Sequence, residues 1–294
     1  MSNDASTLSA TPSAAGSTGG SLLPISRLAW TSIGRLAVRD TGSQDAEQEV
    51  IVLWPAILSD HRIYRQQINA WRDRYRLVVI DGPGHGESEA APDTFAMARC
   101  GEAISEVLDF LGIRKPVIAI GTSWGGLAAG EFAIAHPDRV RALVMLNTPV
   151  DTKSDGPGFG DRFIVWGARW IHTSGIYREG VAKAFFLPAT RERGGEMLRD
   201  FHQHLREADG ASLARSVRSV LVDRDPIAPR MHMITAPTLF VAGRHDAMYP
   251  LADLRRAAAV LPRGRFEAID SAHISVVDAP DQATALIDDF LQHA

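Results

Sequence analysis

A short apolar run leads into the sequence GTSWGG, and a second apolar segment follows it. Residues 116–120 are typical of a buried strand, whereas residues 127–133 have the composition of a helix. A sharp turn between a strand and a helix strains its central residue, Ser123, so the residues two positions before and after must be small. Gly121 and Gly125 meet that need. The sequence therefore predicts a strand–turn–helix unit with Ser123 at a helix N-terminus, where free N–H groups favour negative charge.

The rest of the chain alternates between apolar runs and helical patterns. Further strands are expected at 35–40, 49–54, 76–81, 141–147, 237–242 and 265–269, and further helices at 63–71, 95–111, 251–261 and 280–292. Asp93 or Thr94 is expected to cap the helix over 95–111. Strands that alternate with helices predict an α/β fold whose central sheet is mostly parallel, with helices on both faces.

The alternation stops over residues 148–230, which are rich in Trp, Phe, His and Arg and contain no strand pattern. This segment predicts a helical lid inserted into a core made of residues 25–147 and 231–294, because lids commonly cover the strand ends of such folds. Residues 1–24 contain few large apolar side chains and lack the basic and apolar regions of a signal peptide. They predict a disordered tail.

The composition excludes several classes of protein. The chain has 294 residues, 45% of them hydrophobic, which is ample for a large core. Its net charge of −4 argues against nucleic acid or an anionic membrane as a partner. No apolar run approaches the ~20 residues that span a bilayer. The single cysteine, Cys100, excludes an internal disulfide and fits a reducing compartment, so a cytoplasmic protein is expected.

No metal or cofactor is expected either. No group of Cys, His or carboxylate residues has the spacing of metal ligands. The glycine-rich sequence GPGHGES at residues 82–88 lacks the Lys-Ser/Thr ending of a phosphate-binding loop.

With GTSWGG, GPGHGES, Asp246 and His273 in their order, the chain resembles the α/β-hydrolase superfamily. The resemblance extends from about residue 27 to residue 292, apart from the detail of the lid. The strings IVLWPAILSDHRIY, HPDRVRALVMLNTP and AHISVVDAP are similar to the branch of enol-lactonases and carboxylesterases. The resemblance implies the α/β-hydrolase fold and a serine nucleophile.

A serine nucleophile needs a base beside it, and the base needs an orienting acid. On this fold the expected order along the chain is serine, acid, histidine. His273 directly follows the last predicted strand and is the candidate base, and Asp246 follows the strand at 237–242 and is the candidate acid. Some members carry the acid one strand earlier, but that position is Asn147 here. Asp270 remains a weaker rival for the acid.

The resemblance also implies two N–H donors for a developing oxyanion. One is the amide of Trp124, directly after the serine. The other comes from the loop after the strand at 49–54, where most members have His-Gly. An ungapped alignment puts that pair on Pro55-Ala56 and the donor at Ile57, although a shift by one residue would make Ala56 the donor.

Two further groups of residues are interpreted from their surroundings. Asp81 and His85 match a motif that is largely structural in the superfamily, and the glycines around His85 already explain a turn, so a structural role is favoured over direct catalysis, which stays open. Three aromatic residues of the lid are expected to form an apolar substrate pocket, together with Phe185 and Phe186, although aromatics at helical spacing are also typical of a core. The three are Phe163, Trp166 and Trp170.

The sequence thus predicts a cofactor-free serine hydrolase that cleaves a small carboxylic ester or lactone through an acyl-enzyme. Hydrolysis of a carbon–carbon bond in a dienoate-type diketone, or perhydrolysis, would use the same triad and stays open. Dehalogenase and epoxide-hydrolase chemistry are disfavoured because both place Asp at the position of Ser123. A non-catalytic binding protein or receptor also stays open, since fold does not fix function. The oligomeric state is not predicted.

Overall fold

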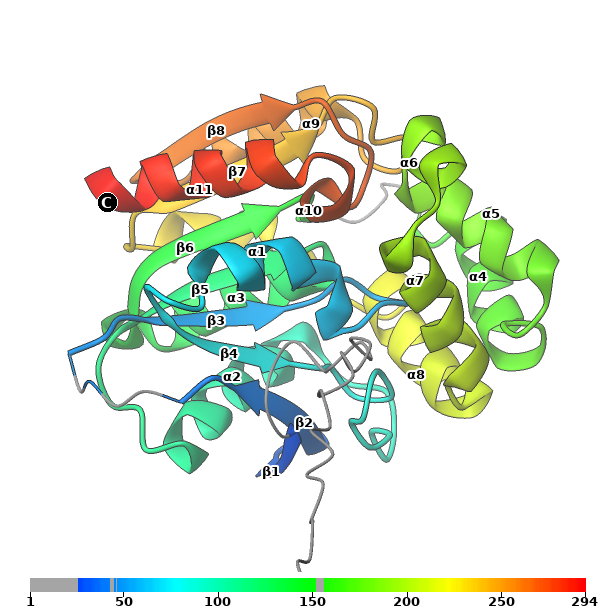
Figure 1. Ribbon diagram of the computed structural model, residues 1–294, viewed down its shortest axis with the longest axis horizontal. Coiled ribbons are helices and arrows are strands. Elements are labelled where there is room, and N and C mark those ends of the chain that lie inside the picture. The colour runs from blue at the N-terminus through cyan, green and yellow to red at the C-terminus, as the bar shows by residue number, and fades with distance from the viewer. Residues whose placement is uncertain (1–25, 43–44, 46, 152–155) are drawn as a thin grey trace, which may run out of the picture.

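The computed structural model describes residues 26–42, 45, 47–151 and 156–294, so the tail expected at 1–24 lies outside the described residues. A single sheet of eight strands forms the centre of the described part (Figure 1). Its strands are β1 (Ser26–Thr31), β2 (Gly34–Asp40), β3 (Val50–Trp54), β4 (Arg76–Ile80), β5 (Val117–Thr122), β6 (Val140–Leu146), β7 (Thr238–Gly243) and β8 (Gly264–Ile269).

The strand order in the sheet is β1-β2-β4-β3-β5-β6-β7-β8. β2 runs antiparallel to β1 and β4, whereas every neighbouring pair from β4 to β8 is parallel. Gly121 of β5 lies opposite Trp54 of β3 and Met145 of β6. Because parallel strands end at the same edge, the loops after β3, β5, β7 and β8 meet there, which is the usual ligand-binding edge of such sheets.

Helices cover both faces of the sheet. Figure 1 shows α1 and α11 in front of the strands and α2 and α3 behind them. The helices are α1 (Arg65–Trp71), α2 (Met97–Phe110), α3 (Trp124–Ala135), α4 (Phe159–Trp170), α5 (Gly175–Phe185), α6 (Pro188–Arg193), α7 (Glu196–Glu207), α8 (Gly210–Leu221), α9 (Leu251–Ala258), α10 (Ser275–Asp278) and α11 (Pro280–His293), with 3-10 turns at His61–Tyr64, Pro137–Arg139 and Ala228–Met233. The α/β-hydrolase fold expected from the sequence is confirmed.

The core lies around the central strands and α3. Every residue of β3, β5 and β7 is buried, as their continuous apolar sequences predict. α3 is apolar except for Glu131, and its residues from Trp124 to Ala133 are buried between the sheet and α2, which explains why it shows no amphipathic pattern. Burial of each large aliphatic side chain here contributes roughly 1.5–3 kcal/mol relative to exposure.

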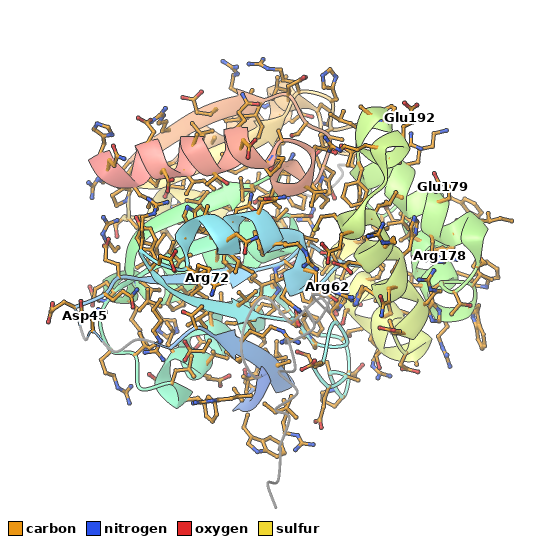
Figure 2. The ribbon with its side chains drawn as sticks, viewed as in Figure 1. Asp45, Arg62, Arg72, Arg178, Glu179 and Glu192 are labelled. Atoms are coloured by element: carbon orange, nitrogen blue, oxygen red, sulfur yellow. The ribbon has the colours of Figure 1, made fainter. Side chains whose placement is uncertain are left out.

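Five helices, α4–α8, are inserted between β6 and β7, and we call them the helical insertion. They lie beyond the edge where the parallel strands end (Figure 1). The carbonyl of Val150 accepts hydrogen bonds from the N–H groups of Ile227 (3.0 Å) and Ala228 (3.1 Å), so the two ends of the insertion are joined where they leave the core. Figure 2 shows Arg178 and Glu179 on the insertion and Arg62 where the core meets it.

The structure differs from the sequence prediction in several elements. β1 and α10 were not expected, and the helix expected to start at residue 95 begins at Met97. Its N-cap is Ala96, without a side-chain hydrogen bond, so the predicted cap at Asp93 or Thr94 is wrong. In place of a local cap, the N–H of Phe95 donates a hydrogen bond to Ser219 Oγ of the insertion (2.9 Å). No helix of the described residues is long and apolar enough to cross a membrane.

Candidate active site

Ser123 lies between β5 and α3 in a strained backbone conformation. Its φ is 55° and its ψ is −111°, a region that costs a non-glycine residue of order 1–3 kcal/mol. A Cβ on Gly121 would overlap the backbone of Gly125, and a Cβ on Gly125 would overlap the carbonyl of Trp54. The two glycines therefore let the turn close against β3, and the tight turn carries Ser123.

Two hydrogen bonds connect three residues at the carboxyl edge of the sheet. His273 Nε2 lies 2.8 Å from Ser123 Oγ, and His273 Nδ1 lies 2.7 Å from Asp246 Oδ2. A carboxylate can only accept, so Nδ1–H donates to Asp246 and Nε2 is left to accept the serine hydroxyl. His273, Ser123 and Asp246 are all buried. This is the geometry of a nucleophile, a base and an orienting acid.

The surroundings of Asp246 keep it ionised. Burial by itself would raise the pKa of this carboxyl, but the charge and hydrogen bond of His273 and the backbone N–H groups of Met248 and Tyr249 bring the pKa below its ordinary value. The N–H groups of Met248 and Tyr249 donate to Oδ1 at 2.9 and 3.3 Å. Both carboxylate oxygens therefore have donors, and the carboxylate is fixed facing the imidazole.

The two alternative positions for the acid are residues 147 and 270, and neither places a carboxylate at His273. Asn147 Nδ2 donates to the carbonyl of Ala272 (3.1 Å) and lies 3.5 Å from Asp246 Oδ2. Asp270 is an exposed residue that accepts from His245 Nε2 at 2.6 Å. The structure therefore brings Asp246 to His273 and leaves Asp270 on the surface.

The two candidate oxyanion donors lie on neighbouring elements. Trp124 is the first residue of α3, so its N–H has no acceptor within the helix. Ile57 lies in the turn after β3, where the N–H of Leu58 is already bonded. The N–H groups of Ala56 and Ile57 have no acceptor within the part of the chain that the structure describes, so both remain available. We keep Ile57 as the candidate because its side chain also lines the cavity described below.

His85 fixes the turn at Ile57 and Leu58 through a hydrogen bond of its side chain. Its Nδ1–H donates to the carbonyl of Pro83 (3.0 Å), and its Nε2 accepts from the N–H of Leu58 (3.0 Å). Burial, with the nearby His204, lowers the pKa of His85 to about 3, so the ring is neutral and Nε2 is free to accept. Leu58 has a φ of 62°, which a leucine adopts only when its neighbours fix it. His85 thus positions the turn and does not contact Ser123 or His273 by any hydrogen bond of the described residues.

Tyr64 adds a second support, which the sequence did not indicate. Its hydroxyl donates to the carbonyl of Trp54 (2.9 Å) and lies 2.8 Å from Thr122 Oγ1. Trp54 ends β3 and Thr122 precedes Ser123, so one buried phenol joins the turn of Ile57 to the turn of Ser123.

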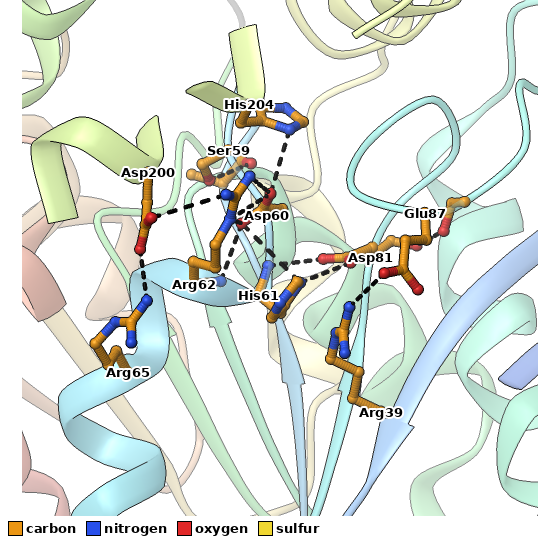
Figure 3. Close-up of polar contacts among 12 residues, drawn as sticks. Arg39, Ser59, Asp60, His61, Arg62, Arg65, Asp81, Glu87, Asp200 and His204 are labelled. Carbon is orange, nitrogen blue, oxygen red and sulfur yellow. Dashed lines mark hydrogen bonds and ion pairs between the residues drawn. The ribbon is translucent and has the colours of Figure 1, made fainter. Parts of the chain in front are cut away.

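A polar cluster connects the loop after β3 to α7 (Figure 3). Asp60 is 3% exposed, accepts from Arg62 at 2.6 Å and lies 3.3 Å from His204 Nδ1 of α7. Arg65 of α1 bonds Asp200 of α7 at 2.6 Å. Burial would raise the pKa of Asp60, but His204 and Arg62 hold it well below its ordinary value. The cluster fastens α7 to the segment that follows the candidate oxyanion turn.

The expected aromatic pocket is only partly formed by the expected residues. A cavity of about 350 Å³ lies between the helical insertion and the loop after β3, and Phe163, Phe185 and Ile57 line it. Phe163 is thus where the prediction put it. Trp166 and Trp170 are 49% and 64% exposed on α4 and do not line this cavity. Phe186 packs edge-on against Phe201 in the interior of the insertion.

A larger cavity of about 580 Å³ surrounds the polar cluster and is lined by charged residues such as Arg39, Glu87 and Asp200. Neither cavity is lined by Ser123, His273 or Asp246, but Phe185, in the wall of the smaller cavity, packs with its ring centroid 5.4 Å from that of His273. The smaller cavity is therefore the one beside the candidate site. The described residues hold no group of three or more His, Cys, Asp or Glu side chains arranged to bind a metal ion.

Known proteins share this arrangement of elements. A family model described as alpha/beta hydrolase fold matches residues 49–183. The 3-oxoadipate enol-lactonase 1 of Acinetobacter baylyi is 24% identical over 265 residues, which cover 87% of this chain and 93% of that protein. A 2-hydroxy-6-oxononadienedioate/2-hydroxy-6-oxononatrienedioate hydrolase of Pseudomonas putida is 29% identical over 74% of this chain and 78% of its own length.

Among solved structures, the enol-lactonase of Burkholderia xenovorans superposes with a TM-score of 0.83 at 24% identity, over 90% of this chain and all of that one. At this identity the superposition shows the fold. The family model and the relatives support a member of the α/β-hydrolase superfamily and a hydrolase of that fold.

Proposed function

We propose that the protein is a serine hydrolase that cleaves a small carboxylic ester or lactone and uses no cofactor. The observation that carries the proposal is the pair of hydrogen bonds from Ser123 to His273 (2.8 Å) and from His273 to Asp246 (2.7 Å). A buried serine in this setting is a usable nucleophile only if its proton has an acceptor, and Nε2 of His273 is placed to be that acceptor.

The reaction proceeds in two halves. His273 Nε2 takes the hydroxyl proton while Ser123 Oγ attacks the carbonyl carbon, and Asp246 stabilises the imidazolium. The N–H groups of Trp124 and Ile57 bind the oxygen that gains negative charge. The imidazolium then gives its proton to the departing oxygen, and the acyl group stays on Ser123. Water, deprotonated by His273, releases the acid and restores the serine.

The insertion acts in this proposal as a lid. Phe185 of the insertion and Tyr249 of the loop after β7 pack with their ring centroids 5.4 and 5.5 Å from that of His273, so aromatic rings from the insertion and from the core cover the base. Exclusion of water strengthens the electrostatic interactions of the triad. Relatives named as enol-lactonases favour an ester or lactone as the substrate class.

A fluorophosphonate probe tests the nucleophile directly. Wild type should be labelled and should hydrolyse members of a panel of 4-nitrophenyl esters and lactones, whereas Ser123→Ala should not be labelled and should lose up to ~10⁶ in kcat. Its melting temperature should stay near that of wild type, because the hydroxyl supports no core packing. Activity of purified Ser123→Ala within tenfold of wild type, or labelling at another residue, would refute the proposal.

A further inference from the structure

The cavity beside the candidate site has an unusual lining. It holds about 350 Å³, within the range of small-molecule pockets, and every side chain in its wall is apolar except that of Tyr177. The hydroxyl of Tyr177 already donates to the carbonyl of Ile164 at 3.1 Å. No charged residue lines the cavity. No side chain in its wall is therefore placed to bind an ionised group.

Two residues in the wall of the cavity contact the proposed catalytic groups, and a third is itself the candidate oxyanion donor. Phe185 packs against His273 with 5.4 Å between ring centroids. Met248 lies in the wall and donates its backbone N–H to Asp246 Oδ1 at 2.9 Å. Ile57, the candidate oxyanion donor, supplies a third wall. A substrate bound at Ser123 would thus have its carbonyl beside this apolar space.

The cavity also reaches the surface of the molecule. Phe163 of α4 is 49% exposed and Ile176 of α5 is 86% exposed, and both line it. The opening of the cavity therefore lies between α4 and α5. Because Phe163 and Ile176 are apolar, an apolar group can enter the cavity past them.

On these observations, and building on the proposed hydrolase function, we propose that the cavity binds a hydrocarbon chain of the substrate. The protein then selects uncharged esters with a chain of several carbons and rejects isosteric esters whose chain ends in a carboxylate. An unpaired carboxylate in this cavity would lose its hydration without gaining a partner. The selection sets this chain apart from a hydrolase whose substrate carries a free carboxylate.

Two matched pairs of substrates test the selection. 4-Nitrophenyl hexanoate and the 4-nitrophenyl monoester of adipate differ only by a terminal methyl or carboxylate on the acyl side. Hexyl acetate and the acetate of 6-hydroxyhexanoate differ in the same way on the alcohol side. In at least one pair the neutral ester should have a kcat/KM about 100-fold higher or more. The pair that discriminates identifies which side of the ester occupies the cavity.

Chain length supplies an independent measurement. On that side of the ester, kcat/KM should rise about fourfold for each added methylene until the cavity is filled, since burial of a methylene is worth about 0.8 kcal/mol and 1.4 kcal/mol is a factor of ten. A kcat/KM that does not change with chain length on either side, or ratios within threefold for both matched pairs, would overturn the proposal.

A variant with a matched control ties the selectivity to this cavity. Gly180 of α5 lines the cavity, and a Cβ there meets no atom within 4 Å, so Gly180→Leu should fold and narrow the space. It should lower kcat/KM at least tenfold for the neutral substrate whose six-carbon chain occupies the cavity, 4-nitrophenyl hexanoate or hexyl acetate, and leave the two-carbon counterpart, 4-nitrophenyl acetate or ethyl acetate, within about twofold. Gly175 lies in the same helix, is equally open and does not line the cavity. Gly175→Leu should match wild type on all substrates, and equal behaviour of the two variants would count against the cavity.

Binding separates this inference from the proposed function. Calorimetric titration of Ser123→Ala with the same pairs should show tighter binding of the neutral member. If wild type hydrolyses no ester yet Ser123→Ala discriminates within a pair, the cavity is correct and the hydrolase proposal fails. If wild type hydrolyses esters without discriminating, and Ser123→Ala does not discriminate either, the hydrolase proposal stands and the cavity proposal fails.

Discussion

Asn147 and Asp246 lie side by side, but only one of them carries a charge. Asn147 Nδ2 is 3.5 Å from Asp246 Oδ2, and the same amide donates to the carbonyl of Ala272 behind His273. A carboxylate at residue 147 would face Asp246 at short range, and two like charges so close cannot both ionise easily. The uncharged amide of Asn147 avoids this repulsion and still donates a hydrogen bond to the carbonyl of Ala272.

The identity of the acid is testable at this scale. Asp246→Asn keeps the shape of the hydrogen bond but removes the charge that stabilises the imidazolium, so kcat should fall by up to about 10⁴. Asp270→Asn removes only an exposed contact to His245 and should stay within a few-fold of wild type. The double variant Asp246→Asn, Asn147→Asp should regain part of the loss. A wild-type kcat for Asp246→Asn at several pH values would show that the acid is elsewhere.

His85 makes the stability of the protein depend on pH. Its pKa in the folded protein is about 3, against about 6.5 in an unfolded chain, so between these values the unfolded state binds more protons. Stability should therefore fall as the pH falls through this window, by up to about 1.4 kcal/mol per pH unit.

Denaturant unfolding of wild type and His85→Gln at pH 7 and pH 5 measures this contribution. Glutamine does not titrate, and the other ionisable groups are common to both proteins. Wild type should lose about 2 kcal/mol more than the variant between the two pH values. Equal losses would mean that His85 is not held neutral.

At the scale of elements, two contacts anchor the loop after β3 on the side away from the strand. Leu58 is bonded to His85, and Asp60 is bonded to Arg62 and lies against His204 of α7. The candidate oxyanion turn lies between these anchors and β3. The position of α7 and the geometry of that turn are consequently linked through one buried carboxylate (Figure 3).

Removal of that carboxylate should be costly. Asp60→Asn removes the negative charge that Arg62 and His204 Nδ1 contact in a buried site, and loss of one partner of a buried pair costs roughly 3–5 kcal/mol. Asp253 pairs with Arg256 on the surface of α9, so Asp253→Asn should change the free energy of unfolding by less than about 1 kcal/mol. Urea unfolding of both variants compares the two pairs, and similar small changes would show that the Asp60 cluster is not a structural anchor.

Local sequence patterns were sufficient to predict much of the core. The buried strands β3, β5 and β7 are continuous apolar runs, and the turn at Ser123 follows from two glycines, so neither needs knowledge of distant residues. β1 was missed because it is an edge strand that pairs only with β2 and exposes Trp30, which leaves little apolar pattern.

Contacts between distant segments could not be predicted in this way. His204 meets Asp60 only because α7 folds back over the loop after β3, and no spacing in the sequence records that contact. The aromatic residues of α4 illustrate a second limit. Phe163, Trp166 and Trp170 share the helical spacing of a buried stripe, yet only Phe163 lines the cavity, since the packing of α5 and α8 decides which face is covered.

At the scale of the whole molecule, burial is unevenly distributed. The buried residues of α4 are Gly167 and Ala168, whereas in α3 every residue from Trp124 to Ala133 is buried. α8 belongs to the insertion like α4, but eight of its residues are buried, among them Leu213, Val217 and Val220. Segments with few buried contacts open at lower free energy.

Native-state hydrogen exchange should therefore rank these helices. Amides in the middle of α3 should exchange most slowly, those of α8 next, and those of α4 fastest, because α4 can detach without exposing a large apolar area. Protection of α4 equal to that of α3 would mean that the insertion and the core open as one unit.

The joined ends of the insertion have a consequence for how this molecule can change. Its two ends meet at Val150, Ile227 and Ala228, beside two strands that are neighbours in the sheet. A segment that leaves and re-enters a scaffold at one point can be exchanged for another of different length without shifting the register of the sheet, and the added loop costs little entropy. The length and sequence of residues 151–226 can therefore vary without a change in the strand register, provided that the contacts of Phe185 with His273 and of His204 with Asp60 are kept.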